Sequence, residues 1–396
     1  MSEKLTGSML DKNAGQFVKT LQGEKGVGFQ DGWHIHKDWY AKTHDYSFAF
    51  DSIESARGNR VEHTEEMKYI RAKNVDGKFS ICVKDDCFEA TEWALGQLSM
   101  KIEIPSSTIL REMNRVESPD NMHVDTMVML FNNYARHINQ EKKFRLRTYT
   151  DGTLRAFLTE KYAIIDNRWV MEVLQSLLPE GRLSHWRSDE DTLYGNILIP
   201  DSMIESTDDD GDYGCMVSIG NCEIGKRRLS QTPSIFRSIC MNGCIWGGKM
   251  GVTLNKRHSG EIDYSELSKL MAENIAEQLK LNSTIMDAFL TTMKYGFNGV
   301  PAECVIAAVC KDKKLNTTES AEILSQFNDF EKHHQTLFGV INAITRAGQE
   351  FNASRWVELD SIGGDLMNST KSWDKYLTIA RTYKGEDLKE VFGSAV

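Results

Sequence analysis

The sequence lacks the short motifs that would assign it to a familiar class of enzyme. It has no G-x-x-x-x-G-K-[ST] phosphate-binding loop, no G-x-G-x-x-G after a predicted strand, no G-x-S-x-G and no H-E-x-x-H. No run of 18 or more apolar residues is present, so no transmembrane helix is expected. Only 6 prolines occur among 396 residues, which indicates regular structure with few linkers. We therefore expect a protein that is not an enzyme and needs no cofactor.

The net charge and the cysteine content further limit the kind of protein that this sequence can encode. The net charge of −10 argues against a protein that binds DNA with its whole surface, but it does not exclude a local basic stripe. The eight cysteines lack the dense spacing of a secreted disulfide scaffold, and the first residues lack the apolar core of a signal peptide. We therefore expect reduced thiols, no bound metal and a cytoplasmic location.

A β-hairpin is the clearest local prediction. Residues 144–150 (FRLRTYT) alternate with period two, and the alternation resumes over 153–162. The dipeptide Asp151-Gly152 between them favours a tight turn. Asp166-Asn167 then marks the start of a helix that ends at about Leu178.

The order of expected elements predicts an α+β fold. A central, mostly antiparallel sheet with one inserted helix would lie between N-terminal helices and a long C-terminal helical region. We expect three parts: an aromatic-rich segment 1–87, a core domain 88–260 and a helical region 261–396. Residues 32–50 alternate roughly like a strand. Helical spacing is found over 88–101, 120–139, 263–280, 283–294, 300–311, 318–330, 333–351 and 372–382.

Three short motifs resemble a known family. Arg155 to Tyr162, followed by Asp166-Asn167, is similar to "RAfLSdrY…lDN". Residues 220–225 (GNCEIG) and 237–243 (RSICMNG) are similar to "NSE.G" and "R.vC.NG", although Cys222 stands where a small hydroxyl residue is usual. In this order they resemble a phage- and plasmid-borne family catalogued as a domain of unknown function. The resemblance covers about 144–248 and implies a mobile-element origin without supplying an activity.

A basic cluster lies inside this region. Lys226, Arg227, Arg228 and Arg237 fall within twelve residues of an acidic protein. Guanidinium groups pair with phosphate oxygens, so the cluster predicts an exposed nucleic-acid contact, with Trp246 available for base stacking. The alternative is a solvated turn with three basic residues and a tryptophan in the core.

Arg145, Arg147 and Arg155 suggest a second line of contact. Arg145 and Arg147 lie on one side of a strand, because the side-chain period is two. Arg155 lies across the hairpin turn. The alternative is that these arginines form salt bridges with Asp151, Glu160 or the helices.

Three possible cation sites have plainer explanations. His34 and His36, with His44 nearby, lack an acidic or cysteine partner at a convincing spacing. Cys240 and Cys244, near Cys215 and Cys222, do not have the C-x₂-C spacing of zinc sites. Residues 207–212 (TDDDGD) resemble part of a calcium loop but lack its full ligand pattern, so a polar hairpin loop is favoured.

Together these features favour a nucleic-acid-binding protein of a phage or plasmid. It would act in DNA recombination, replication or single-strand annealing in the host cytoplasm, with single-stranded DNA as partner and self-association into a homo-oligomer. One alternative is a mobile-element protein that binds and blocks a host defence protein. The other is a metal-dependent nuclease built from scattered carboxylates.

Overall fold

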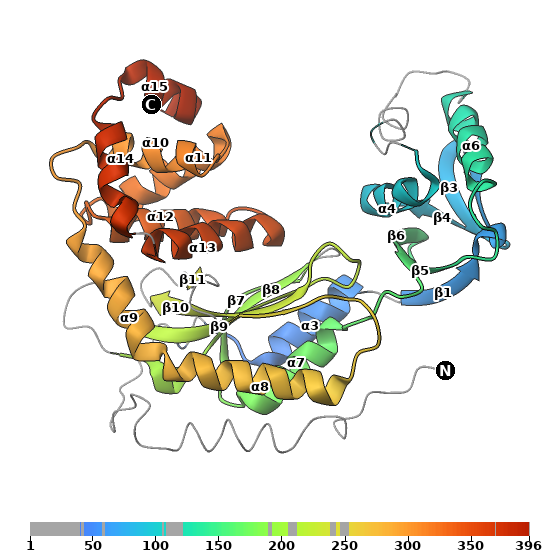
Figure 1. Cartoon of the computed structure of the whole chain (residues 1–396), viewed down its shortest axis with the longest axis horizontal. Coiled ribbons are helices and arrows are strands. Elements are labelled where there is room, and N and C mark those ends of the chain that lie inside the picture. Colours follow the sequence, from blue (N-terminus) through green and yellow to red (C-terminus); the bar gives the residue numbers. More distant parts are fainter. Residues whose placement is uncertain are drawn as a thin grey trace.

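A computed structural model of the chain describes residues 40, 43–57, 60–104, 107, 122–188, 192–204, 212–237, 243–245, 253–368 and 370–395. The expected α+β class is confirmed. The strands form two mostly antiparallel sheets, however, and not one central sheet. One sheet belongs to a small lobe built from residues 60–161, and the other lies in a larger body with the C-terminal helices (Figure 1).

The small lobe contains a curled six-stranded sheet with the strand order β1-β5-β6-β4-β3-β2. Its two edge strands, β1 and β2, are separated in the chain by only the 3-10 turn Met67–Tyr69. Three residues reach about 10 Å, so the two edges approach each other at this corner. The strands are β1 (Arg60–Glu66), β2 (Ile70–Val75), β3 (Lys78–Val83), β4 (Asp86–Ala90), β5 (Lys143–Tyr149) and β6 (Thr153–Thr159).

Two helices fill the small lobe, α4 (Glu92–Ile102) and α6 (Met122–Ala135). Leu98 of α4 and Phe131 of α6 join Phe144 and Phe157 of the sheet in one apolar core. The expected domain boundary after residue 87 falls inside β4. The sheet of the small lobe therefore contains strands from both sides of the boundary expected between 1–87 and 88–260.

The predicted hairpin is confirmed. β5 and β6 pair antiparallel, with Phe144 opposite Thr159, and Gly152 adopts a φ of +82° in the turn. The Asp151 carboxylate accepts a hydrogen bond from the Thr153 amide at 2.9 Å, which closes the turn locally.

The prediction that all cysteines are reduced is wrong for one pair. Cys82 of β3 and Cys87 of β4 are direct cross-strand partners, their Cα atoms lie 3.9 Å apart, and they form a disulfide. The hairpin register brings together two thiols whose spacing in sequence resembles no disulfide framework. Disulfides are typical of oxidising compartments, so the cysteines no longer argue for a cytoplasmic location.

The larger body contains a sheet covered on both faces. Its order is β11-β10-β9-β8-β7, with β12 also pairing with β10. Leu193 and Ile197 of β8 face one side, whereas Tyr194 between them packs on Trp356 on the other. The strands are β7 (Arg182–Ser188), β8 (Leu193–Leu198), β9 (Tyr213–Asn221), β10 (Leu229–Arg237), β11 (Gly243–Ile245) and β12 (Leu254–Lys256).

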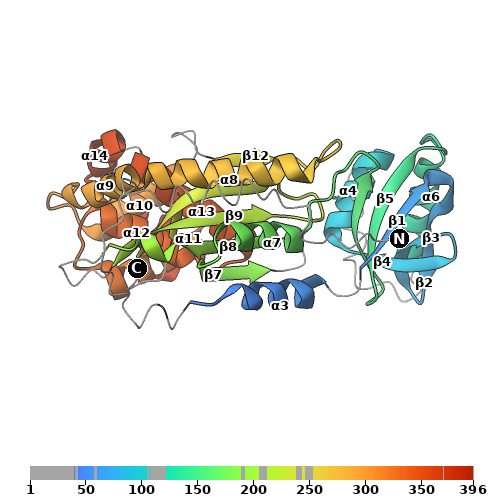
Figure 2. The same cartoon turned by 90° about the horizontal axis from the view of Figure 1, so that it is seen from below.

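Helices from distant parts of the sequence cover these two faces. On one face, α3 (Tyr46–Arg57), α7 (Asn167–Leu177) and α8 (Tyr264–Lys280) share a core with the sheet. On the other face lie α12 (Leu337–Gly348) and α13 (Ala353–Asn368) (Figures 1 and 2). Residues 46–50, expected to continue a strand, begin α3 instead.

The C-terminal helical region is confirmed and has two structural roles. α8 covers one face of the sheet, and the helices after it pack around Val305, Ile341 and Leu377 in a core that also includes Tyr213 and Ile235 of the sheet. These helices are α9 (Asn282–Thr291), α10 (Ala302–Asp312), α11 (Thr317–Gln326), α12, α13, α14 (Trp373–Ala380) and α15 (Gly385–Phe392). None of the described helices is long and apolar enough to cross a bilayer.

Candidate nucleic-acid interface

The turn between β9 and β10, residues 222–228, carries three of the predicted contact residues. Lys226 and Arg228 are exposed. Arg227 is half-buried, and its Nη2 lies 3.4 Å from Oε1 of Glu358 in α13. Lys226 Nζ lies 5.1 Å from the ring centroid of Trp93 in α4. The turn therefore presents two cations to solvent while it contacts both the small lobe and the C-terminal helices.

The backbone of this turn is held in place by the small lobe. The Ile224 carbonyl accepts hydrogen bonds from Trp93 Nε1 at 2.9 Å and from Gln97 Nε2 at 2.8 Å. Gly225 has a φ of +85°, and a Cβ added there would lie 3.1 Å from Leu158 Cδ2. The positive φ strongly favours glycine, and any larger residue would also require the Leu158 side chain to shift. A turn fixed in this way positions its charges before any ligand arrives.

Glu223 is the main anchor of the turn. Its Oε2 lies 2.7 Å from Arg60 Nη1, and its Oε1 accepts a hydrogen bond from the Asn167 amide at 2.7 Å. Its carbonyl accepts a hydrogen bond from Arg147 Nη1, also at 2.7 Å. The helix α7 begins at Asn167 as predicted, but Glu223 supplies the capping carboxylate, while Asp166 forms an ion pair with Arg60 at 3.0 Å.

The predicted second line of contact does not form an exposed basic face. Arg147 has no exposed surface and pairs with Glu62 at 2.7 Å. Arg155 is 7% exposed, pairs with Asp151 at 2.8 Å and stacks on the ring of Tyr149. Arg145 is half-buried and donates to the Tyr162 carbonyl at 3.1 Å. The salt-bridge alternative is therefore the correct one for Arg147 and Arg155.

Arg237 is also separated from the turn. It lies at the opposite end of β10, roughly 25 Å along the strand from Leu229 at about 3.3 Å per residue. It is 2% exposed, pairs with Glu331 at 2.7 Å and lies over the ring of Phe338. The prediction that Arg237 joins Lys226, Arg227 and Arg228 on one exposed face is wrong, because the strand separates them and a buried carboxylate partners Arg237.

Several predicted positions lie outside the described residues. These are Trp246, His34, His36, Cys240 and residues 207–211 of the calcium-like loop. Of the remaining candidates for metal binding, His44 stacks on Phe48 with ring centroids 4.2 Å apart. Within the described ranges, no three His, Cys, Asp or Glu side chains gather where they could hold a metal ion.

Sequence reasoning missed a buried polar cluster beside the turn. Asn221 Nδ2 donates to Asn167 Oδ1 at 2.8 Å, and Asn221 Oδ1 lies 3.0 Å from His258 Nε2. The Tyr162 ring stacks on His258 with centroids 5.2 Å apart. Two of the motifs that carry the family resemblance, Asp166-Asn167 and 220–225, meet here. The two motifs were visible in the sequence, but their meeting was not, and His258 belongs to neither motif.

The buried histidine predicts a dependence of stability on pH. Burial, with a contribution from the charge of Arg147, lowers the pKa of His258 to about 4. The unfolded chain takes up a proton near pH 6.5, so stability should fall as pH decreases from about 6.5 towards 4. We expect this residue to account for a loss of about 2 kcal/mol in unfolding free energy between about pH 7.5 and pH 5, measured by urea unfolding.

The control for this prediction is the variant His258→Gln, which has no titrating group. Its unfolding free energy should change less between the two pH values than that of the parent. Equal changes in the two proteins would show that other groups carry the effect.

The chain as a whole shows no match to known proteins. No protein-family model matches it, and neither curated proteins nor solved structures provide a match. The resemblance to the phage- and plasmid-borne family stays a prediction based on the motifs themselves.

Proposed function

We propose that the protein binds nucleic acid through the exposed cations of the 222–228 turn, as a non-enzymatic factor of a phage or plasmid in the host cytoplasm. The observation that supports this is the pairing of exposed charge with a fixed backbone. Lys226 and Arg228 project from a turn whose carbonyl and carboxylate groups are bonded to both α4 and α7. In a protein with a net charge of −10, such a turn favours an anionic partner.

Because only two cations of the turn are exposed, a single turn is expected to bind nucleic acid weakly. Each phosphate contact adds about 0.7 to 0.9 to the slope of log affinity against log salt, so two contacts give modest affinity. Self-association would place many such turns along one strand and raise the overall affinity. A homo-oligomer acting on single-stranded DNA in recombination, replication or strand annealing is therefore the form we propose.

Binding assays on a double variant test this proposal. Lys226→Ala/Arg228→Ala should lower the salt slope by about 1.5 and weaken binding equally for all sequences, because phosphate contacts carry no base information. Fluorescence anisotropy with single- and double-stranded oligonucleotides at about 50 mM and about 200 mM salt measures both quantities.

The matched control is Arg381→Ala/Lys389→Ala, which removes two exposed charges from the C-terminal helices. It should bind as the parent does. Equal affinity of the turn variant and the parent would contradict the proposal. If the parent itself fails to bind at about 50 mM salt, where charge contacts are least screened, binding to a host protein becomes the better explanation.

A further inference from the structure

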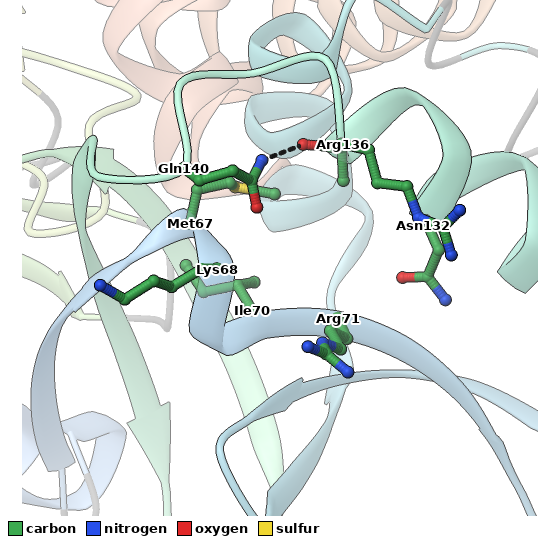
Figure 3. Close-up of a pocket in the computed structure, with 8 residues that line it drawn as sticks. Met67, Lys68, Ile70, Arg71, Asn132, Arg136 and Gln140 are labelled. Atoms are coloured by element: carbon green, nitrogen blue, oxygen red, sulfur yellow. Dashed lines mark hydrogen bonds between the residues drawn. The ribbon is translucent and has the colours of Figure 1, made fainter.

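A pocket of about 280 Å³ lies in the small lobe, at the corner where β1 passes into β2. It is formed by residues outside the 222–228 turn, and Figure 3 shows its side chains. Its lining consists of Met67, Lys68, Ile70, Arg71, Asn132, Ala135, Arg136 and Gln140.

The lining is positively charged. Three of the residues are cations and none is a carboxylate. Lys68 pairs with Glu66, which neutralises it. Arg71 and Arg136 are exposed, and neither forms an ion pair with any residue that the structure describes. Two like charges at one concave site are unfavourable without a counter-ion, so this arrangement favours an anionic ligand.

The walls of the pocket are fixed by hydrogen bonds. Asn132 of α6 accepts from the Ala72 amide and donates to the Ala72 carbonyl, both at 2.9 Å, which holds the helix against edge strand β2. Arg136 follows directly after Ala135, the last residue of α6, and also lines the pocket. In Figure 3 the Arg136 side chain extends beside Asn132, whereas Arg71 projects from β2, so the two cations line different walls of one pocket.

The apolar floor of the pocket and the C-terminal end of α6 also affect the electrostatic potential in the pocket. Met67 and Ile70 are each 2% exposed, and such an apolar floor strengthens charge interactions above it. The C-terminus of α6 contributes about half a negative charge. Gln140 Nε2 donates to the Ala135 carbonyl at 2.8 Å and to the Ile138 carbonyl at 2.7 Å, which reduces that effect. Two guanidinium charges outweigh the remainder.

We infer that this pocket binds a terminal phosphate group, with Arg71 and Arg136 pairing with its oxygens. A phosphate monoester carries a charge of about −1.5 to −2, which matches two guanidinium groups better than a phosphodiester does. The pocket volume is just below the usual range of about 300–1,000 Å³ for small-molecule sites, so it suits one phosphate with a small part of its ester. The ligand is either a free nucleotide or the phosphorylated end of a strand.

Calorimetry on the full chain tests the site with inorganic phosphate, adenosine monophosphate and adenosine. Two charge-assisted pairs support a dissociation constant of the order of 1 mM for the phosphate compounds, and adenosine should not bind. The variant Arg71→Ala/Arg136→Ala should weaken binding roughly tenfold or more. The control is Lys73→Ala, an exposed cation on the same face of β2 that does not line the pocket, and it should bind as the parent does.

Two further comparisons identify the source of the phosphate and separate this site from the turn. Stronger binding of a 5′-phosphorylated than a 5′-hydroxyl oligonucleotide, lost in Arg71→Ala/Arg136→Ala, identifies a strand end. Equal binding of the two oligonucleotides, with adenosine monophosphate still bound, identifies a free nucleotide. Lys226→Ala/Arg228→Ala should keep phosphate binding. Absence of phosphate binding in the parent, or unchanged binding in a normally folded Arg71→Ala/Arg136→Ala, overturns the inference.

Discussion

Replacing Arg147 with alanine is expected to lower the free energy of unfolding by about 3–5 kcal/mol. Its guanidinium group has no exposed surface, forms an ion pair with the Glu62 carboxylate and donates a hydrogen bond to the Glu223 carbonyl, each at 2.7 Å. The substitution leaves the 9%-exposed Glu223 with less compensation for its buried charge. It also removes a connection between the small lobe and the turn. Urea unfolding followed by tryptophan fluorescence measures the loss.

The neighbouring variant Arg145→Ala is the matched control. Arg145 lies on the same strand but is half-buried and makes one hydrogen bond, to the Tyr162 carbonyl. Its loss should cost only about 1 kcal/mol. An Arg147→Ala protein with parental stability but a reduced salt slope for DNA binding would restore the hypothesis that Arg147 contacts phosphate.

Replacing Arg237 with alanine should be similarly costly, at about 3–5 kcal/mol. Arg237 Nη1 lies 2.7 Å from Oε1 of Glu331, in the π-helical turn Phe327–Glu331 after α11, and the two side chains are 3% and 1% exposed. Without the arginine, a carboxylate stays buried between the sheet and the C-terminal helices. Thermal and urea unfolding of the variant measure the loss.

A double variant separates the ion pair from the packing around it. Arg237→Met/Glu331→Leu removes both charges and keeps apolar volume, and such replacements of buried pairs are often neutral or stabilising. It should therefore recover most of the stability lost in Arg237→Ala. A double variant as unstable as the single one would show that lost packing, for example against Phe338, causes the effect.

Local patterns in the sequence identified elements whose stability is local. The 143–159 hairpin has alternating residues and its own turn dipeptide, so its pairing requires no distant information. Strand β1 (RVEHTEE) has no apolar alternation, and it forms because β5 supplies a partner edge along its whole length. Helix α13 contains Gly363-Gly364, which lowers its intrinsic helix propensity, and packing against the sheet stabilises it.

For the candidate nucleic-acid interface, too, some features were determined by the sequence and others by the tertiary structure. The sequence by itself determined the α+β class, the hairpin and the presence of Lys226, Arg227 and Arg228 on a turn. It also determined the motifs at 166–167 and 220–225, although not that they meet.

Only the tertiary structure decided which arginines are exposed. Arg147 and Arg237 resemble Arg228 in sequence, but their partners Glu223 and Glu331 lie 76 and 94 residues away along the chain. A charge is a property of one residue, whereas its burial depends on partners that folding brings near. The pocket at Arg71 and Arg136 has the same origin, because it exists only where α6 packs on β2.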